Sequence, residues 1–221
     1  MNEKETIKNF LSIEQPMPLL MSHTSTIALL LKGARKMFGC NLNTGKYERF
    51  EFTKERLEDE TLHSFQFSGL INYLIFLEQI GAALKPKNIT KHTKRNEIFR
   101  CLKYFSNISS DEAKINVIVA LRNSLVHRFG LATKKSLKPN PRKFILSSER
   151  NSEVVGFPEN EWNGDFSIKL DSCSTTIYII DLVELIENTY QKVLEEVEND
   201  NIEITLADGI QELKARYSIT H

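Results

Sequence analysis

Apolar residues recur at intervals of three and four positions along most of the chain, which is the spacing of amphipathic helices. Gly39 and the pair Lys85-Pro86 stand where two of these patterns stop, since glycine and proline commonly end helices. The turn residues Asn43-Thr44-Gly45 predict a loop or a short hairpin over residues 40–52. The patterns predict a mainly α fold with helices over residues 17–38, 54–84, 94–106, 113–126, 175–200 and 207–217.

The helix predicted over residues 113–126 has the clearest signals. Ser109 and Glu112 stand three positions apart just before it, which is the spacing of a capping box. Its apolar residues cover more than one stripe of the helix surface, so neighbouring elements must surround most of it. We therefore expect this helix to lie in the interior of the fold.

The pattern changes between residues 131 and 172. Pro139 and Pro141 exclude a helix there, the stretches KFILSS and DFSIKLD alternate like strands, and Asn163-Gly164 is typical of a turn. A segment of about forty residues buries too little surface to fold alone. We therefore expect one domain over residues 1–221, with a small β-containing insertion at about 131–172.

The composition suits a folded domain, because 41% of the 221 residues are apolar and 26% are charged. No apolar run reaches the roughly eighteen residues of a membrane-spanning helix, and the stretch MNEKETIKNF mixes acids and bases unlike a secretion signal. Cys40, Cys101 and Cys173 are odd in number and far apart, which disfavours disulfides and fits a reducing compartment. We therefore expect a cytoplasmic protein that does not contact a membrane.

The net charge is zero, but the charges are unevenly placed along the chain. Residues 128–148 hold six bases and no acid, and residues 85–100 hold six bases and one acid. Residues 181–203 hold eight acids and one base. A polyanion would meet two basic segments, although solvated loops and helix faces explain either segment equally well.

The segment VALRNSLVHRFGL, residues 119–131, places several polar side chains at the end of the apolar helix. An uncompensated polar group in such a place costs roughly 1–3 kcal/mol, which favours a specific use for these side chains. They are Arg122, Asn123, Ser124, His127 and Arg128.

An arginine followed by a histidine at this spacing is not specific by itself. Arg56 with His63 and Arg216 with His221 show similar spacings in the same chain. Neither of those pairs has an asparagine directly after the arginine, and neither ends a strongly apolar, capped helix. The segment 119–131 is therefore distinguished by its context.

With Arg122, Asn123 and, after four intervening residues, His127, the chain resembles the HEPN superfamily of helical domains. The resemblance covers the motif, its helix and the mostly helical layout, and it implies a HEPN-like helical bundle. It also implies a metal-independent endoribonuclease without a cofactor, in which the ribose 2′-hydroxyl attacks the phosphodiester and leaves a cyclic phosphate. Many bacterial members act as toxins or phage-defence effectors, so an antitoxin or a regulatory protein is an expected partner.

The resemblance assigns catalytic roles to Arg122, Asn123 and His127. Imidazole titrates near neutral pH and would transfer the proton, while the planar guanidinium would bind the phosphate. Asn123 would orient the imidazole or the phosphate, and Ser124 and Arg128 are accessory candidates. RNA-binding candidates follow in the basic segment, which would lie along the RNA backbone: Lys134, Lys135, Lys138, Arg142 and Lys143.

Helical geometry separates two of these side chains. At the rotation of an ideal helix, Arg122 and His127 point roughly 140° apart. Either the arginine reaches around the helix, or the helix ends near residue 126, or a second copy completes the site. HEPN ribonucleases use the last arrangement, so a homodimer is expected.

Other chemistries lack support in the sequence. There is no HExxH pair, no glycine-rich phosphate loop and no GxSxG nucleophile motif, so no metal or nucleotide cofactor is expected. The main alternative is a polar network that holds the helix end without catalysis. The chain would then be a noncatalytic HEPN-like module for dimerisation or binding, with its acidic C-terminal helix as a docking face.

Overall fold

The computed structural model describes residues 3–13, 24–48, 59–90, 95–128, 130–133, 141–167 and 171–219. Within these ranges the fold is mainly α, as the sequence predicts, with short strands between the helices. The helices are α1 (Glu3–Leu11), α2 (Thr26–Phe38), α3 (Asp59–Ala83), α4 (Glu97–Phe105), α5 (Glu112–Arg128), α6 (Ile179–Glu198) and α7 (Gly209–Tyr217).

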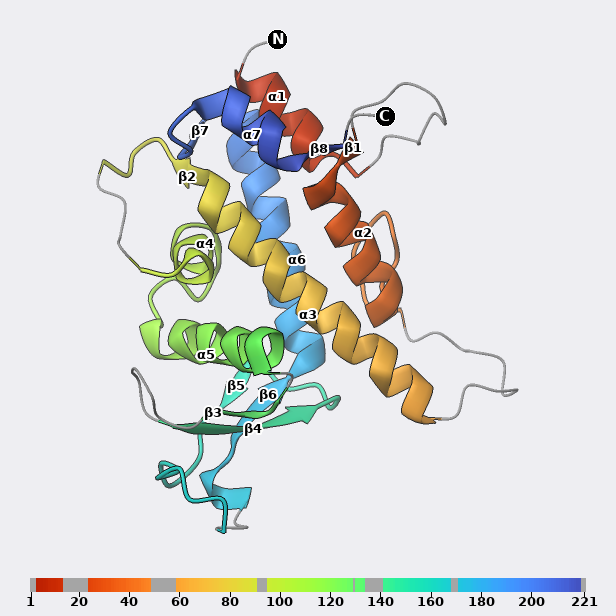
Figure 1. The fold of residues 1–221 in the computed structure, drawn as a ribbon, viewed down its shortest axis with the longest axis vertical. Coiled ribbons are helices and arrows are strands. Elements are labelled where there is room, and N and C mark those ends of the chain that lie inside the picture. Colours follow the sequence, from red (N-terminus) through yellow and green to blue (C-terminus); the bar gives the residue numbers. More distant parts are fainter. Residues whose placement is uncertain are drawn as a thin grey trace.

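Helices α3 and α6 form the centre of the molecule (Figure 1). Helix α3 crosses in front of α6, with α2 on one side and α4 and α5 on the other. Most side chains between these helices are apolar, and several are fully buried, including Leu70, Leu77, Ile118, Leu121 and Val183. Helix α5 is surrounded on most of its faces, as the breadth of its apolar surface predicts.

Helix α2 starts later than the sequence pattern predicts. Thr24 and Ser25 form strand β1 (Thr24–Ser25), which pairs with strand β8 (Ser218–Ile219) near the other end of the chain. The Ser25 hydroxyl accepts a hydrogen bond from the Ile27 amide at 3.1 Å and so caps the helix. The predicted end is confirmed, because Gly39 has a φ of 88° and bonds back to Arg35. Residues 14–23 lie outside the described residues.

The cap of α5 differs from the predicted capping box. The helix begins at Glu112, and the side chain of Asp111 accepts a hydrogen bond from the Lys114 amide at 3.0 Å. Ser109 lies in the preceding turn and is not the cap. An aspartate at this position also places negative charge at the positive helix end.

Four strands form a sheet beneath α5, in the order β3, β4, β6 and β5 (Figure 1). Their bounds are β3 (Ala132–Thr133), β4 (Arg142–Ser147), β5 (Val155–Gly156) and β6 (Thr175–Tyr178). Strands β4 and β6 are parallel, and the other pairs are antiparallel. Phe144, Val155 and Ile177 belong to the same buried cluster as the helices, so the sheet is part of the common core.

Two predictions for this region are wrong. The strand predicted at 165–171 is absent from its described part, because Phe166 and Ser167 form a turn and Asp171 begins a short 3-10 helix; residues 168–170 lie outside the described residues. The second strand is Thr175–Tyr178, which the apolar spacing assigned to the following helix. Three of its four residues are β-branched, and Thr175 and Ile177 are buried on one face. The β-containing segment therefore extends beyond residue 172.

The remaining elements are short. Helix α1 was not predicted, although Ile7, Phe10 and Leu11 are buried at helical spacing. Strand β2 (Leu84–Pro86) follows α3 and pairs with β7 (Ile202–Ile204). The turn at 42–44 closes a narrow hairpin, in which Cys40 and Tyr47 form an isolated antiparallel β-bridge. The sequence predicts either a loop or a short hairpin here. None of the helices in the described ranges is both long enough and apolar enough to span a membrane.

A buried ion pair joins α2 to α6. Arg35, fully buried on α2, donates to both carboxylate oxygens of Glu187 on α6, at 2.8 and 2.6 Å. Its remaining nitrogen donates to the carbonyls of Leu42 and Asn43 at 2.7 and 3.1 Å, which fixes the hairpin. Tyr73 on α3 donates to the same carboxylate at 2.7 Å. Three helices and one loop therefore depend on a single carboxylate.

Candidate functional site

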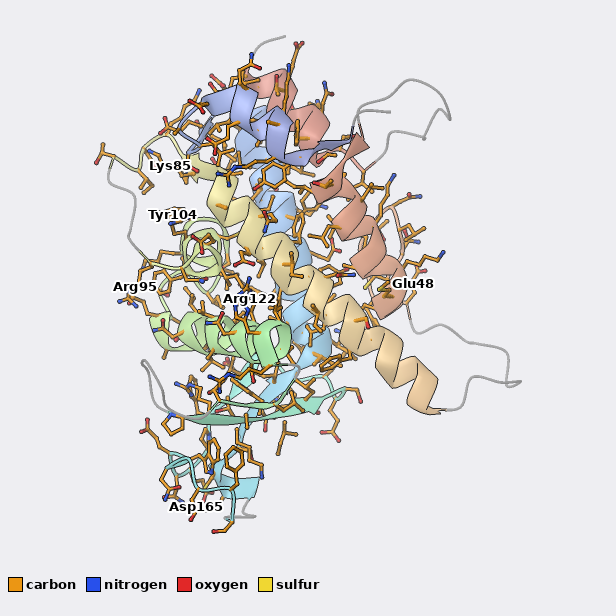
Figure 2. All side chains as sticks on the ribbon, in the orientation of Figure 1. Glu48, Lys85, Arg95, Tyr104, Arg122 and Asp165 are labelled. Atoms are coloured by element: carbon orange, nitrogen blue, oxygen red, sulfur yellow. The ribbon has the colours of Figure 1, made fainter. Side chains whose placement is uncertain are left out.

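The polar residues of the motif lie on the last turns of α5, where the helix meets α3 (Figure 2). Nη1 of Arg122 lies 2.7 Å from Nε2 of His127 and donates to the side-chain oxygen of Asn123 at 3.2 Å. His127 is exposed, whereas Arg122 and Asn123 are partly buried. The structure thus brings all three predicted catalytic side chains together at one partly accessible place.

On an ideal helix Arg122 and His127 point roughly 140° apart, and the structure shows how they nevertheless come into contact. Helix α5 continues through Arg128, so the helix does not end early. The arginine side chain is long enough to reach around the helix and contact the imidazole within one chain. A second copy is therefore not needed to join the two groups, and this reason for expecting a homodimer is removed.

Glu78 on α3 also belongs to the site, although no sequence pattern predicted it there. Its carboxylate accepts from Nη2 of Arg122, and the two side chains are only 16% and 12% exposed. It is the only acidic or basic residue between Ser64 and Leu84, within a strongly apolar helix. This single charge in an apolar helix was the sequence feature that could have indicated Glu78, because a lone charge in such a stretch needs a partner.

The hydrogen bonds define how the site is arranged. A guanidinium can only donate, so Nε2 of His127 accepts the bond from Arg122 and the ring proton is assigned to Nδ1. Glu78 and His127 hold the two terminal nitrogens of the guanidinium, while Nε of Arg122 is buried without a partner. The site therefore contains a fixed cation beside a titratable ring that reaches solvent.

The two accessory candidates have different surroundings. Ser124 is fully buried, and its hydroxyl donates to the carbonyl of Gly130 at 2.6 Å. The amide of Gly130 donates back to the Ser124 carbonyl at 3.3 Å, so Ser124 closes the turn after the helix. Arg128 is exposed and forms no ion pair among the described residues. Of these two, only Arg128 presents a group that can reach a ligand in solution.

The predicted RNA-binding residues are described only in part. Lys134, Lys135 and Lys138 lie outside the described residues. Arg142 and Lys143 begin β4 and pair with Thr133 and Ala132 of β3, which follows α5 closely. The start of β4 is thereby held near the end of the helix that carries His127.

Arg142 and Lys143 are not equivalent. Burial lowers the pKa of Arg142, an effect that the nearby Glu161 opposes, and Nε of Arg142 is buried without a partner. Lys143 is partly exposed and forms no ion pair within the described ranges. Lys143 is therefore the better placed of the two to meet a phosphate.

In the other basic segment, residues 85–100, each base that the structure describes is paired with an acid, while Lys91 and Lys94 lie outside the described residues. Lys85 pairs with Glu203 at 2.5 Å, and Lys87 pairs with Asp200 at 3.0 Å. Both acids come from the acidic segment 181–203, so the two oppositely charged segments meet each other. The structure therefore favours a solvated, paired surface here over a free polyanion site.

No group of three or more metal-binding side chains gathers anywhere in the described ranges. Comparison with protein-family models, with curated proteins and with solved structures finds no match to this chain. The likeness to HEPN domains therefore rests on the motif, its helix and the mainly helical fold.

Proposed function

We propose that the chain is a HEPN-like helical bundle that acts as a metal-independent endoribonuclease. The observation that carries this proposal is the direct contact of Arg122 with His127, beside Asn123 and anchored by Glu78. The cluster lies at an exposed helix end and not within the core. The further expectations of a homodimer, an antitoxin partner and a role as a toxin or phage-defence effector belong to the same proposal.

Each side chain has a role in such a reaction. Nε2 of His127 carries a lone pair and faces the guanidinium, so it can take the proton of a ribose 2′-hydroxyl next to a bound phosphate. As the 2′-oxygen bonds to phosphorus the P–O5′ bond breaks, and the 5′-oxygen leaves with a proton from the imidazolium or from water. Arg122 donates to the phosphate and counters the charge that grows on it as the oxygen attacks. Asn123 holds Nη1 of Arg122, and Glu78 holds Nη2, so both act as positioning residues.

The phosphate has to displace an existing contact of the guanidinium. Both terminal nitrogens of Arg122 are engaged in the free chain, by His127 and Asn123 at Nη1 and by Glu78 at Nη2. The contact with His127 is the most exposed of these, so it is the one that substrate replaces. The imidazole and the guanidinium then lie on either side of the scissile phosphate.

A noncatalytic module is the second candidate, and one observation favours it. The terminal nitrogens of Arg122 are already satisfied within the chain, which is also expected of a polar network that only holds a helix end. In that case α5 and α3 are fastened together, and the acidic helix α6 provides a docking face. The two candidates differ in whether His127 is needed for any chemistry.

The test is cleavage of a labelled single-stranded RNA by the purified chain in the presence of EDTA. We expect wild type to cleave, His127→Ala and Arg122→Ala to lose at least about a hundredfold in rate, and products to end in a cyclic phosphate. His63→Ala is the matched control, since that histidine lies outside the motif. Equal RNA integrity with wild type and both variants would refute the enzyme and favour the module.

Glu78→Gln separates positioning from chemistry in the same assay. The amide keeps the size of the carboxylate but removes the charge that anchors Arg122. We expect a smaller loss than in His127→Ala, with the pH dependence of the rate unchanged in shape. A loss equal to that of His127→Ala, with an altered pH profile, would contradict the assignment of Glu78 as a positioning residue.

A further inference from the structure

The loop from Phe157 to Ser167, here called the aromatic loop, exposes apolar surface at one end of the molecule. Phe157 and Phe166 are 50% and 62% exposed, the largest fractions among the big apolar side chains that the structure describes. Two such rings on one short loop are unusual on a surface without a partner.

The aromatic loop is held in a fixed shape. Trp162 is buried and donates from its indole nitrogen to the Asp165 carbonyl at 2.9 Å. Its ring meets Phe166 edge to face, with 5.0 Å between centroids. The side chains of Asn163 and Asp165 each accept from an amide two residues on, at 2.9 and 2.8 Å. The part of the loop that carries Phe166 is thus preorganised, which lowers the entropic penalty of docking.

The charge of the aromatic loop argues against nucleic acid as its ligand. It contains three acids and no base, namely Glu159, Glu161 and Asp165. Glu161 lies near Arg142, but Glu159 is exposed and has no ion pair in the part of the chain that the structure describes. An acidic loop repels phosphates, so apolar and basic protein surface is the complementary ligand.

A surface of that chemistry exists on the same chain, at residues 36–46, here called the α2 end. Met37 and Leu42 are exposed apolar side chains, and Lys36 and Lys46 are exposed bases without ion pairs among the described residues. The segment itself contains no acid, and the nearest exposed carboxylate along the chain, that of Glu48, accepts from the side chain of Asn41 at 3.0 Å. The aromatic loop and the α2 end together hold four of the five large exposed apolar side chains in the described ranges.

The two surfaces are too far apart to meet within one chain. Glu48, next to the α2 end, and Asp165, in the aromatic loop, lie at well separated edges of the molecule (Figure 2). The hairpin that carries Leu42 is fixed by Arg35, and the aromatic loop is fixed by its own hydrogen bonds. Within one chain the two surfaces cannot contact each other, so only a second copy can bring them together.

We propose that the chain associates with itself by docking the aromatic loop of one copy on the α2 end of another. Phe157 and Phe166 pack against Met37 and Leu42, and Glu159 lies beside the two lysines. The contact joins two different surfaces. Two copies that make it reciprocally form a closed dimer, whereas copies that make it head to tail form a longer assembly. It does not involve Arg122 or His127 and is independent of the proposed ribonuclease activity.

Sedimentation velocity of the full chain over a concentration series tests this contact. We expect the weight-average sedimentation coefficient to rise with concentration, and Phe166→Ser to weaken association about thirty-fold, as loss of a central aromatic ring does. Leu131→Ser is the matched control, because Leu131 is the fifth exposed apolar residue and lies outside both surfaces. A wild type that stays monomeric throughout, or a Phe166→Ser that associates like wild type, overturns the proposal.

A charge exchange gives a second, independent readout. Glu159→Lys and Lys46→Glu should each weaken association by about tenfold at low salt, and the double variant should restore it. Failure of the double variant to recover association overturns the pairing of these surfaces. Binding of labelled single-stranded RNA should be the same for wild type and Phe166→Ser. Weaker RNA binding with unchanged association would instead make the loop a base-stacking surface.

Discussion

The buried ion pair between Arg35 and Glu187 offers the sharpest test of what holds the helices in place. Replacing Glu187 with glutamine keeps the size of the side chain but removes its charge. Arg35 is then left as an uncompensated cation that is fully buried, and Tyr73 loses a charged acceptor. Burial lowers the pKa of Arg35, but Glu187 outweighs this and holds that pKa above its ordinary value, so Arg35 stays charged.

The size of the effect follows from this environment. Removing one partner of a buried pair destabilises a protein by about 3–5 kcal/mol, against about 0–1 kcal/mol for a pair at the surface. In a chain of this size, each kcal/mol lowers the melting temperature by about 2–4 °C, so a decrease of about 6–20 °C is expected. Urea unfolding followed by circular dichroism measures the free energy directly.

Two variants complete this test. Glu184→Gln is the matched control, because Glu184 lies on the same helix and pairs with Arg150 at 2.6 Å where both side chains are largely exposed. We expect that change to be almost neutral. The double variant Arg35→Met with Glu187→Leu removes both charges and should recover most of the loss. If Glu187→Gln were as mild as Glu184→Gln, the reasoning about this network would be wrong.

Two further predictions concern pH and close helix packing. Burial raises the pKa of the Cys40 thiol from 9.0 to about 11. At pH values below 9.0, the thiol is protonated in the folded and in the unfolded protein. Between this value and about 11 the thiol ionises only in the unfolded protein, so the free energy of unfolding falls by up to about 2–3 kcal/mol. Urea unfolding at pH 8 and pH 10 should show a smaller fall for Cys40→Ala than for wild type. Gly81→Ala should destabilise by about 1–3 kcal/mol or more, because its Cβ would lie 1.9 Å from the Glu97 carbonyl. Gly33→Ala should stabilise by about 0.5–1 kcal/mol, since its Cβ meets nothing closer than 4.0 Å; equal effects at the two glycines would contradict the described packing of α3 on α4.

Helices with long, one-sided apolar patterns were predictable from the sequence. The ends at Gly39 and near Lys85-Pro86 were also predictable, because glycine and proline act locally. Strand β6 was not, since Thr175–Tyr178 joins directly to α6 and a short apolar run suits either state. Its pairing with β4 and β5, which lie about twenty to thirty residues earlier in the chain, determines that it is a strand.

For the candidate site, too, only the residues that lie close together in the sequence were predictable. Arg122, Asn123 and His127 share the last turns of one helix, so their common region could be expected, although the spacing sets Arg122 and His127 about 140° apart. Glu78 comes from another helix, and no local sequence pattern shows that it pairs with Arg122. The direct contact of Arg122 with His127 depends on how the arginine side chain bends, which an ideal helical projection leaves out.

The central claim is that Arg122 and His127 cleave RNA by activating the ribose 2′-hydroxyl. Its most direct measurement compares two oligonucleotides of one sequence, one all-ribose and one with a single 2′-deoxy substitution at the mapped cleavage position. The account predicts that the chain cleaves the first, and that cleavage at the substituted position of the second disappears. Cleavage of both at equal rates would contradict it.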